Sequence, residues 1–143
     1  MSGTRVASPA VVFDTATLLR SLLLGDERAK ALRQAWQQGR CRPLIDAEGA
    51  QALMRALACP ALKLSEEERH EVLADFLPYA QAVPAVPVAR SQPALALAEA
   101  GRAALLVSDC GQLRASFERR FSRRGKPACR LLGSDEFYAS LQT

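Results

Sequence analysis

Short apolar segments that alternate with amphipathic helical patterns are the feature that most constrains the fold of this chain. Ala10–Phe13 joins small and β-branched residues to an aromatic one and stops at Asp14, as a buried parallel strand does. Three more segments have this character: Pro43–Ile45, Ala104–Val107 and Cys129–Leu132. Over Val83–Val88, valine alternates with proline and alanine, so a strand there must be short or lie at a sheet edge because proline has no N–H to donate.

Apolar residues at helical spacing occupy the segments between these strands. Seven helices are expected. The first ends before Gly25, the second spans Arg28–Gln38, the third runs from Asp46 to before Pro60, and the fourth starts at Ser65. The fifth spans Ala94–Ala100, the sixth includes Leu113–Phe121, and the seventh follows a cap at Ser134. Strands that alternate with helices form right-handed crossovers and a parallel sheet covered on both faces. The sequence therefore predicts an α/β fold, a three-layer α/β/α sandwich with a central, mostly parallel five-stranded sheet, in a single domain over residues 1–143.

Polar side chains, most of them carboxylates, follow the expected strands. Beyond the ends of these strands stand Asp14, Asp46, Ser91, Asp109 and Asp135. Ligands of open parallel sheets bind outside the carboxyl ends of the strands, and clustered carboxylates are suited to hard cations. This edge is therefore a candidate site for Mg²⁺ or Mn²⁺ and for phosphoryl chemistry. Helix capping is the favoured role for Asp46 and Asp135, whereas Asp14 and Asp109 fit a functional and a structural role equally well.

Positive charge is concentrated toward the C-terminus. The first hundred residues hold equal numbers of acidic and basic side chains, so the formal net charge of +4 comes from residues 101–143. The bases that follow the fourth strand are Arg114, Arg119, Arg120, Arg123, Arg124, Lys126 and Arg130, with Glu118 as the acid among them. Such a basic segment suits the phosphates of a nucleic acid. A solvated helix face is the alternative interpretation.

Several other classes of protein and site fit the sequence poorly. The N-terminal segment has only a short apolar run, unlike a signal peptide, and charges interrupt every apolar stretch, so we expect a cytoplasmic protein with no membrane partner. Cys41, Cys59, Cys110 and Cys129 lack a metal-ligand spacing and are expected to be buried free thiols. His70 lies in an acidic helix and is expected at the surface.

The order of motifs along the chain carries a resemblance to a known family. Val11–Thr15 pairs an apolar strand with Asp14, Leu18–Leu24 is a leucine-rich helix, and Arg55–Pro60 with Leu62–Ser65 forms a further motif. Later segments of the same kind are Val86–Val88, Leu105–Asp109 and Leu131–Leu141. Together they resemble the PIN domain, the PilT N-terminus-like fold of bacterial toxin nucleases, and the middle motif is similar to one in a toxin-like branch. The resemblance covers nearly the whole chain.

The resemblance implies a metal site made of carboxylates after the first and fourth strands, in the third helix and at the start of the helix after the third strand. Asp14 matches the first position, and Asp109 lies one residue away from the last. Ala52 stands where the helix glutamate is expected, with Glu48 one turn earlier on a similar face, and residues 91–94 contain no carboxylate. The metal ligands would then be Asp14, Asp109 and Glu48, enough for one weak Mg²⁺ or Mn²⁺ site at most.

Because the sequence departs from the family's metal site at these positions, it leaves two hypotheses about function. The first is a PIN-domain protein that resembles the toxin component of a toxin–antitoxin system, has an impaired catalytic site, and binds nucleic acid or a partner. The alternative is an active Mg²⁺-dependent endoribonuclease in which Asp14 and Asp109 are catalytic. RNA is the expected nucleic acid, and the resemblance also implies an antitoxin-like protein or a second copy of the chain as a partner.

Overall fold

A five-stranded parallel sheet forms the centre of the molecule. The computed structural model describes residues 8–84, 93–121 and 129–142. The strands are β1 (Ala10–Phe13), β2 (Arg42–Ile45), β3 (Gln81–Ala82), β4 (Leu105–Val107) and β5 (Arg130–Leu132), in the spatial order β3-β2-β1-β4-β5. Every strand pair within the described residues is parallel. The predicted α/β fold with a five-stranded parallel sheet is therefore confirmed.

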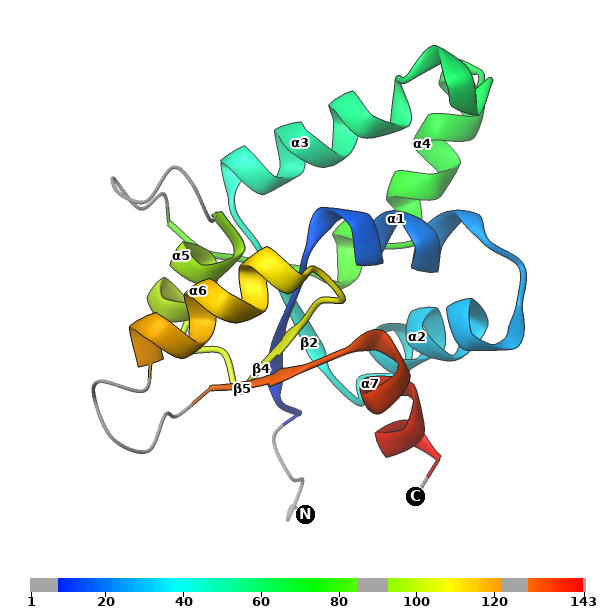
Figure 1. Cartoon of the computed structure of the whole chain (residues 1–143). Coiled ribbons are helices and arrows are strands. Elements are labelled where there is room, and N and C mark those ends of the chain that lie inside the picture. The colour runs from blue at the N-terminus through cyan, green and yellow to red at the C-terminus, as the bar shows by residue number, and fades with distance from the viewer. Residues whose placement is uncertain (1–7, 85–92, 122–128, 143) are drawn as a thin grey trace, which may run out of the picture.

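Helices connect the strands and cover both faces of the sheet (Figure 1). They are α1 (Thr15–Leu23), α2 (Glu27–Gln37), α3 (Ala47–Leu57), α4 (Glu66–Ala74), α5 (Pro93–Ala100), α6 (Gly111–Phe121) and α7 (Ser134–Leu141), with short 3-10 turns η1 (Pro60–Leu62) and η2 (Leu77–Tyr79). In Figure 1, α2 and α7 lie on one side of the sheet, and α5 and α6 on the other. Within the described ranges, no helix is long and apolar enough to cross a bilayer.

The alternation of side chains along each strand separates two apolar cores. Val11 and Phe13 of β1 pack with residues of α1, α2 and α7, whereas Ala10 and Val12 pack with residues of α5 and α6. Successive residues of a strand point to opposite faces of a sheet, so a strand that is apolar throughout is buried on both sides. The three layers of the sandwich follow from this pattern.

Aromatic rings join the elements of the larger core. The Trp36 ring lies 5.6 Å from that of Phe13 and 5.3 Å from that of Phe76, measured between centroids, and both contacts are edge-to-face. Phe137 of α7 meets Phe13 from another direction, also at 5.6 Å. The Trp36 Nε1–H donates a hydrogen bond to the carbonyl oxygen of Asp75 at 2.8 Å, so the polar atom of this buried ring is satisfied. The cluster fixes α2 and α7 against β1.

The third strand lies earlier than predicted. β3 covers Gln81–Ala82 rather than 83–88, and residues 85–88 of the predicted strand lie outside the described residues. The Val83 N–H still donates to the carbonyl oxygen of Ile45 at 2.8 Å, but Pro84 has no N–H and cannot continue the ladder. As expected for such a segment, the strand is short and lies at an edge of the sheet.

The cysteines divide into two pairs. Cys41 and Cys129 are buried, and burial raises the pKa of their thiols to about 12 and about 11, respectively. Cys59 and Cys110 are exposed, so the prediction of buried thiols is wrong for these two residues. Both lie in connections, where the chain runs over the surface. His70 is exposed on α4, as predicted.

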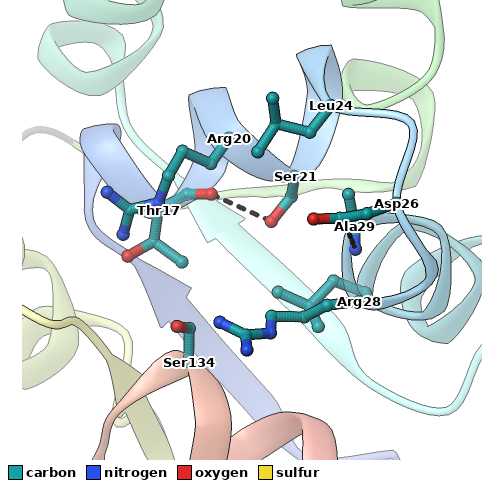
Figure 2. A pocket seen from close by; sticks show the side chains of 9 residues that line it. Thr17, Arg20, Ser21, Leu24, Asp26, Arg28, Ala29 and Ser134 are labelled. Carbon is teal, nitrogen blue, oxygen red and sulfur yellow. Dashed lines mark hydrogen bonds between the residues drawn. The ribbon is translucent and has the colours of Figure 1, made fainter.

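A small cavity lies between α1, α2 and the beginning of α7 (Figure 2). Its volume is about 60 Å³, and Thr17, Arg20, Arg28 and Ser134 are among the residues that line it. Ser134 comes just after β5. The cavity therefore lies beside the carboxyl edge of the sheet, where the sequence places the candidate functional residues.

Candidate functional site

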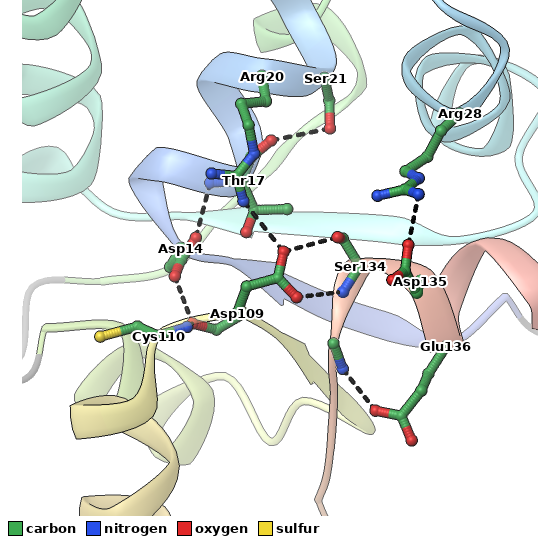
Figure 3. Close-up of polar contacts among 12 residues, drawn as sticks. Asp14, Thr17, Arg20, Ser21, Arg28, Asp109, Cys110, Ser134, Asp135 and Glu136 are labelled. Carbon is green, nitrogen blue, oxygen red and sulfur yellow. Dashed lines mark hydrogen bonds and ion pairs between the residues drawn. The ribbon is translucent and has the colours of Figure 1, made fainter.

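Neighbouring strands bring Asp14 and Asp109 to the same edge of the sheet (Figure 3). β1 pairs with β4, with Phe13 opposite Val107, and the Asp14 N–H donates to the carbonyl oxygen of Val107 at 3.1 Å. Asp14 follows β1 directly, and Asp109 follows β4 after one residue, Ser108. The two residues predicted as catalytic thus share the edge at which ligands bind in sheets of this kind.

Both oxygens of the Asp14 carboxylate accept hydrogen bonds from neighbouring protein groups. Asp14 is the N-cap of α1, and its Oδ1 accepts a hydrogen bond from the Thr17 N–H at 2.8 Å. Its Oδ2 accepts a short hydrogen bond from the Ser108 hydroxyl. That hydroxyl oxygen accepts in turn from the Cys110 N–H at 3.0 Å. Ser108 therefore ties the end of β1 to the segment that leads into α6.

The Asp109 carboxylate caps a helix that is remote in the sequence. Gly133 is the N-cap of α7 and has no side chain to accept a helix N–H. Asp109 supplies the missing acceptor, because its Oδ1 accepts from the Ser134 N–H at 2.8 Å and its Oδ2 from the Ser134 hydroxyl at 2.6 Å. A Cβ atom at position 133 would lie 3.0 Å from Asp109 Oδ1, so the glycine leaves room for this contact. The predicted cap at Ser134 is corrected accordingly: Ser134 is the first residue of the helix.

Arg20 of α1 completes the surroundings of Asp109. Its Nη2 lies 3.0 Å from Asp109 Oδ2, and both side chains are about half exposed. Partial burial raises the pKa of Asp109, but the hydrogen bonds from Ser134 and the charges of Arg20 and Arg28 outweigh it, so the pKa lies below its ordinary value. Asp109 is therefore a stable anion that protein groups already neutralise.

The other polar residues that the sequence places at this edge of the sheet, and Glu48, make different contacts from Asp14 and Asp109. Asp46 caps α3, with its Oδ1 accepting from the Gly49 N–H at 2.7 Å. Asp135 lies in the first turn of α7 and forms an ion pair with Arg28 at 2.5 Å. Glu48 is exposed in the first turn of α3, and Ser91 lies outside the described residues.

The ligand set that the resemblance implies does not fit a divalent cation in this arrangement. In the part of the chain that the structure describes, no three or more His, Cys, Asp and Glu side chains are grouped to hold a metal ion. Asp109 already accepts from Ser134 and Arg20 with both oxygens. The Thr17 hydroxyl nearby is buried without a hydrogen-bond partner among the described residues, but it carries no charge and cannot replace a carboxylate.

The predicted basic residues lie mainly on α6 and just beyond it. Arg114 and Arg119 are exposed on α6, and Arg130 is exposed in β5. Arg120 is part of α6, whereas Arg123, Arg124 and Lys126 lie outside the described residues. The Arg114 Nη2 lies 3.9 Å from Glu136 Oε1, in the first turn of α7. α6 therefore begins beside the candidate site, and its arginines lie along the helix as it leads away from that site.

Sequence analysis did not select five residues that contact these carboxylates or line the adjacent cavity: Thr17, Arg20, Arg28, Ser108 and Ser134. Helical spacing gave a signal for two of them, because Thr17 and Arg20 follow Asp14 at successive intervals of three residues and lie near one face of α1. Pairing of Arg20 with a residue 89 positions away has no such signal.

Comparisons with known proteins add no identification. No protein-family model matches the sequence, and no curated protein matches it.

Proposed function

We propose that this protein is a toxin-like PIN module that binds RNA through its phosphates without cutting it. The observation that carries the proposal is the contact between Arg20 and Asp109 at 3.0 Å, because it fills the place beside this carboxylate with a protein cation. The resemblance to PIN-domain toxin components supports the same class of partner. Such a role places the protein in the cytoplasm.

A guanidinium performs only part of what a metal ion does at a phosphodiester. It neutralises charge and donates hydrogen bonds to phosphate oxygens. It does not lower the pKa of a bound water, which is how a metal generates a nucleophile at neutral pH. A site in which Arg20 neutralises Asp109 is therefore suited to holding a phosphate rather than hydrolysing it.

Two exposed sides of α6 provide the contacts with the RNA backbone, because Arg114 and Arg119 lie about 140° apart around the helix. Arg114 and Arg119 are exposed there, and Arg114 remains about half exposed despite its long contact with Glu136. The Arg119 Nη2 donates to Ser116 Oγ at 3.3 Å, which leaves its other N–H groups available for phosphate oxygens. Arg120, Arg123, Arg124, Lys126 and Arg130 extend this basic segment along the sequence.

Salt-dependent binding of a fluorescent single-stranded RNA tests the proposal. The double variant Arg114→Glu and Arg119→Glu should weaken binding roughly tenfold or more, and each lost phosphate contact should reduce the salt slope by about 0.7. The matched control is Lys30→Glu with Arg55→Glu, which makes the same charge change at exposed residues of α2 and α3. Wild-type binding should not require Mg²⁺ and should persist in EDTA.

Two outcomes would contradict the proposal. Equal losses in the α6 variant and the control would show that net charge, and not the position of the arginines on α6, determines binding. Cleavage of the RNA that requires Mg²⁺ or Mn²⁺ and disappears in Asp14→Asn would establish the active endoribonuclease, with Asp14 and Asp109 as catalytic residues.

A second candidate function is the docking of a protein partner, which the resemblance to toxin components implies and which exposed apolar side chains could serve. They are Leu24, Met54, Leu62, Leu77 and Tyr79, each between 38% and 46% exposed. An antitoxin-like helix or a second copy of the chain would cover such residues. Sedimentation velocity over a hundredfold concentration range tests the homodimer, and a monomer throughout would exclude it.

A further inference from the structure

The cavity between α1, α2 and α7 has properties that RNA binding by α6 does not explain. It measures about 60 Å³ and is lined by three apolar side chains and by two arginines, three hydroxyl side chains and one carboxylate. The polar residues are Arg20, Arg28, Thr17, Ser21, Ser134 and Asp26. This space exceeds what a single water molecule requires. We propose that the cavity binds a small oxyanion of the phosphate type.

Thr17 gives the first argument for a ligand. Its side chain is 2% exposed, and its hydroxyl has no hydrogen-bond partner among the described residues. Ser21, one turn later, donates its own hydroxyl to the Thr17 carbonyl oxygen at 2.9 Å and is satisfied. In Figure 2, Thr17 lies on the side of the cavity nearer Ser134, and its hydroxyl is turned away from Arg28. A buried hydroxyl without a partner is costly, and a bound oxyanion would accept its hydrogen bond.

The two arginines give the second argument. Arg20 reaches the cavity from α1 and Arg28 from α2, and each uses one nitrogen, Nη2, for its carboxylate partner. A guanidinium has five N–H donors, so each arginine retains donors that can contact an oxyanion. About half of each side chain is exposed, which gives a ligand access from solvent.

The negative charges nearby are already engaged. Asp109 and Asp135 are the partners of the two arginines, and the Asp26 Oδ1 caps α2 by accepting from the Ala29 N–H at 2.9 Å. α2 and α7 both begin at this cavity, so their N-terminal dipoles add positive potential to the arginine charges. The lining side chains carry two positive charges and one negative charge, and Asp109 and Asp135 pair with the two positive charges. An oxyanion would therefore be held by the unused N–H donors of the arginines and not by net positive charge.

Titration calorimetry with inorganic phosphate at constant ionic strength tests this site. Thr17→Val and Arg28→Gln should each weaken phosphate binding about tenfold, because each removes a donor to the ligand. Thr15→Val is the matched control for Thr17→Val, since Thr15 is exposed in the first turn of α1, and it should bind phosphate like the wild type. The Arg114→Glu and Arg119→Glu variant should also bind phosphate normally, so the failure of RNA binding and the failure of this site are distinguishable.

Thermal unfolding keeps the test interpretable if a variant changes stability. Phosphate should raise the Tm of the wild type progressively, as expected for a ligand that binds only the folded state. Thr17→Val should have the same or a higher Tm in chloride, because it removes a buried hydroxyl without a partner, yet it should lose most of the rise caused by phosphate. An equal rise in the wild type and Thr17→Val, or an equal rise with chloride, would overturn the proposal.

The source of the phosphate group can be separated in the same assay. If a 5′-phosphorylated oligoribonucleotide displaces inorganic phosphate and its 5′-hydroxyl counterpart does not, the site holds the terminal phosphate of RNA. Displacement by neither oligonucleotide, with phosphate binding intact, identifies a free anion as the ligand.

Discussion

Asp14 and Asp109 end neighbouring strands of one sheet, yet their carboxylates are held in different ways. Asp14 caps the helix that follows it, through the Thr17 N–H three residues later, and its other oxygen accepts from the Ser108 hydroxyl, 94 residues later. Asp109 instead caps α7, through Ser134, 25 residues later, and pairs with Arg20, 89 residues earlier. The comparison shows that equivalent positions at a sheet edge can cap the adjacent helix or a remote one. The predictions below test this difference, from the largest expected effect to the smallest.

Asp109→Asn should lower the free energy of unfolding by about 2 kcal/mol. The amide has one oxygen in place of two, so it cannot accept from both the Ser134 N–H and the Ser134 hydroxyl while pairing with Arg20, and a lost hydrogen bond to a charged group costs about 1.5–3 kcal/mol. Urea unfolding measures this loss. A change below about 0.5 kcal/mol would mean that Asp109 does not hold α7, since surface substitutions without a structural role fall in that range.

Asp14→Ala should cost about 1 kcal/mol, the typical value for loss of an N-cap. Asp14→Asn should cost less than Asp14→Ala, because asparagine caps helices as well as aspartate does and only the acceptor for the Ser108 hydroxyl is lost. The same unfolding assay therefore distinguishes the two carboxylates: the asparagine substitution costs less at Asp14 than at Asp109. Similar losses for both asparagine variants would remove the distinction between capping the adjacent helix and capping a remote one.

The stability of the protein should depend on pH through the Asp109 carboxylate, and this effect should be smaller than those of the substitutions above. The pKa of Asp109 lies below its ordinary value of 3.8 in the folded protein, so its ionised form stabilises the fold above that value and the contribution is lost as the pH falls through the folded pKa. The stability difference between the wild type and Asp109→Asn should be constant from pH 5 to 7 and decrease below about pH 4. A difference that grows as the pH falls would contradict this assignment.

Arg20→Gln should have the smallest effect, a few tenths of a kcal/mol, because its ion pair with Asp109 is half exposed. The loss should shrink further in 1 M salt, where exposed charges are screened. Unfolding at low and high salt measures it. A large, salt-independent loss would show that Arg20 supports the core rather than the charge of Asp109.

The sequence was most informative where local rules decide the structure. The apolar runs located β1, β2, β4 and β5, and the capping pattern from Ser65 located α4, where Ser65 and Glu68 exchange hydrogen bonds. β3 was misplaced because pairing with β2 ends at Pro84, whereas the apolar pattern continues beyond it. Exposure of Cys59 and Cys110 was missed because composition says nothing about which connections face solvent.

The candidate site was predicted only in part. Asp14 and Asp109 were found because each follows a strand, and their placement at one edge follows from parallel pairing of β1 and β4. The contacts of Arg20 and Arg28 depend on how α1 and α2 pack against the start of α7, which no short-range pattern encodes. Those contacts change the chemistry expected at the site, since they place protein cations beside Asp109 and Asp135.

The sequence by itself determined the order of strands and helices, the burial of the sheet on both faces and the two carboxylates at its edge. These features depend on side-chain periodicity and on the chirality of crossovers, which act over short stretches of chain. Only the tertiary structure decided that Asp109 caps α7 and that the Thr17 hydroxyl is buried near two arginines without a hydrogen-bond partner in the described part of the chain. Such contacts join residues far apart in the chain, and they form only when the whole core fixes the distances between helices.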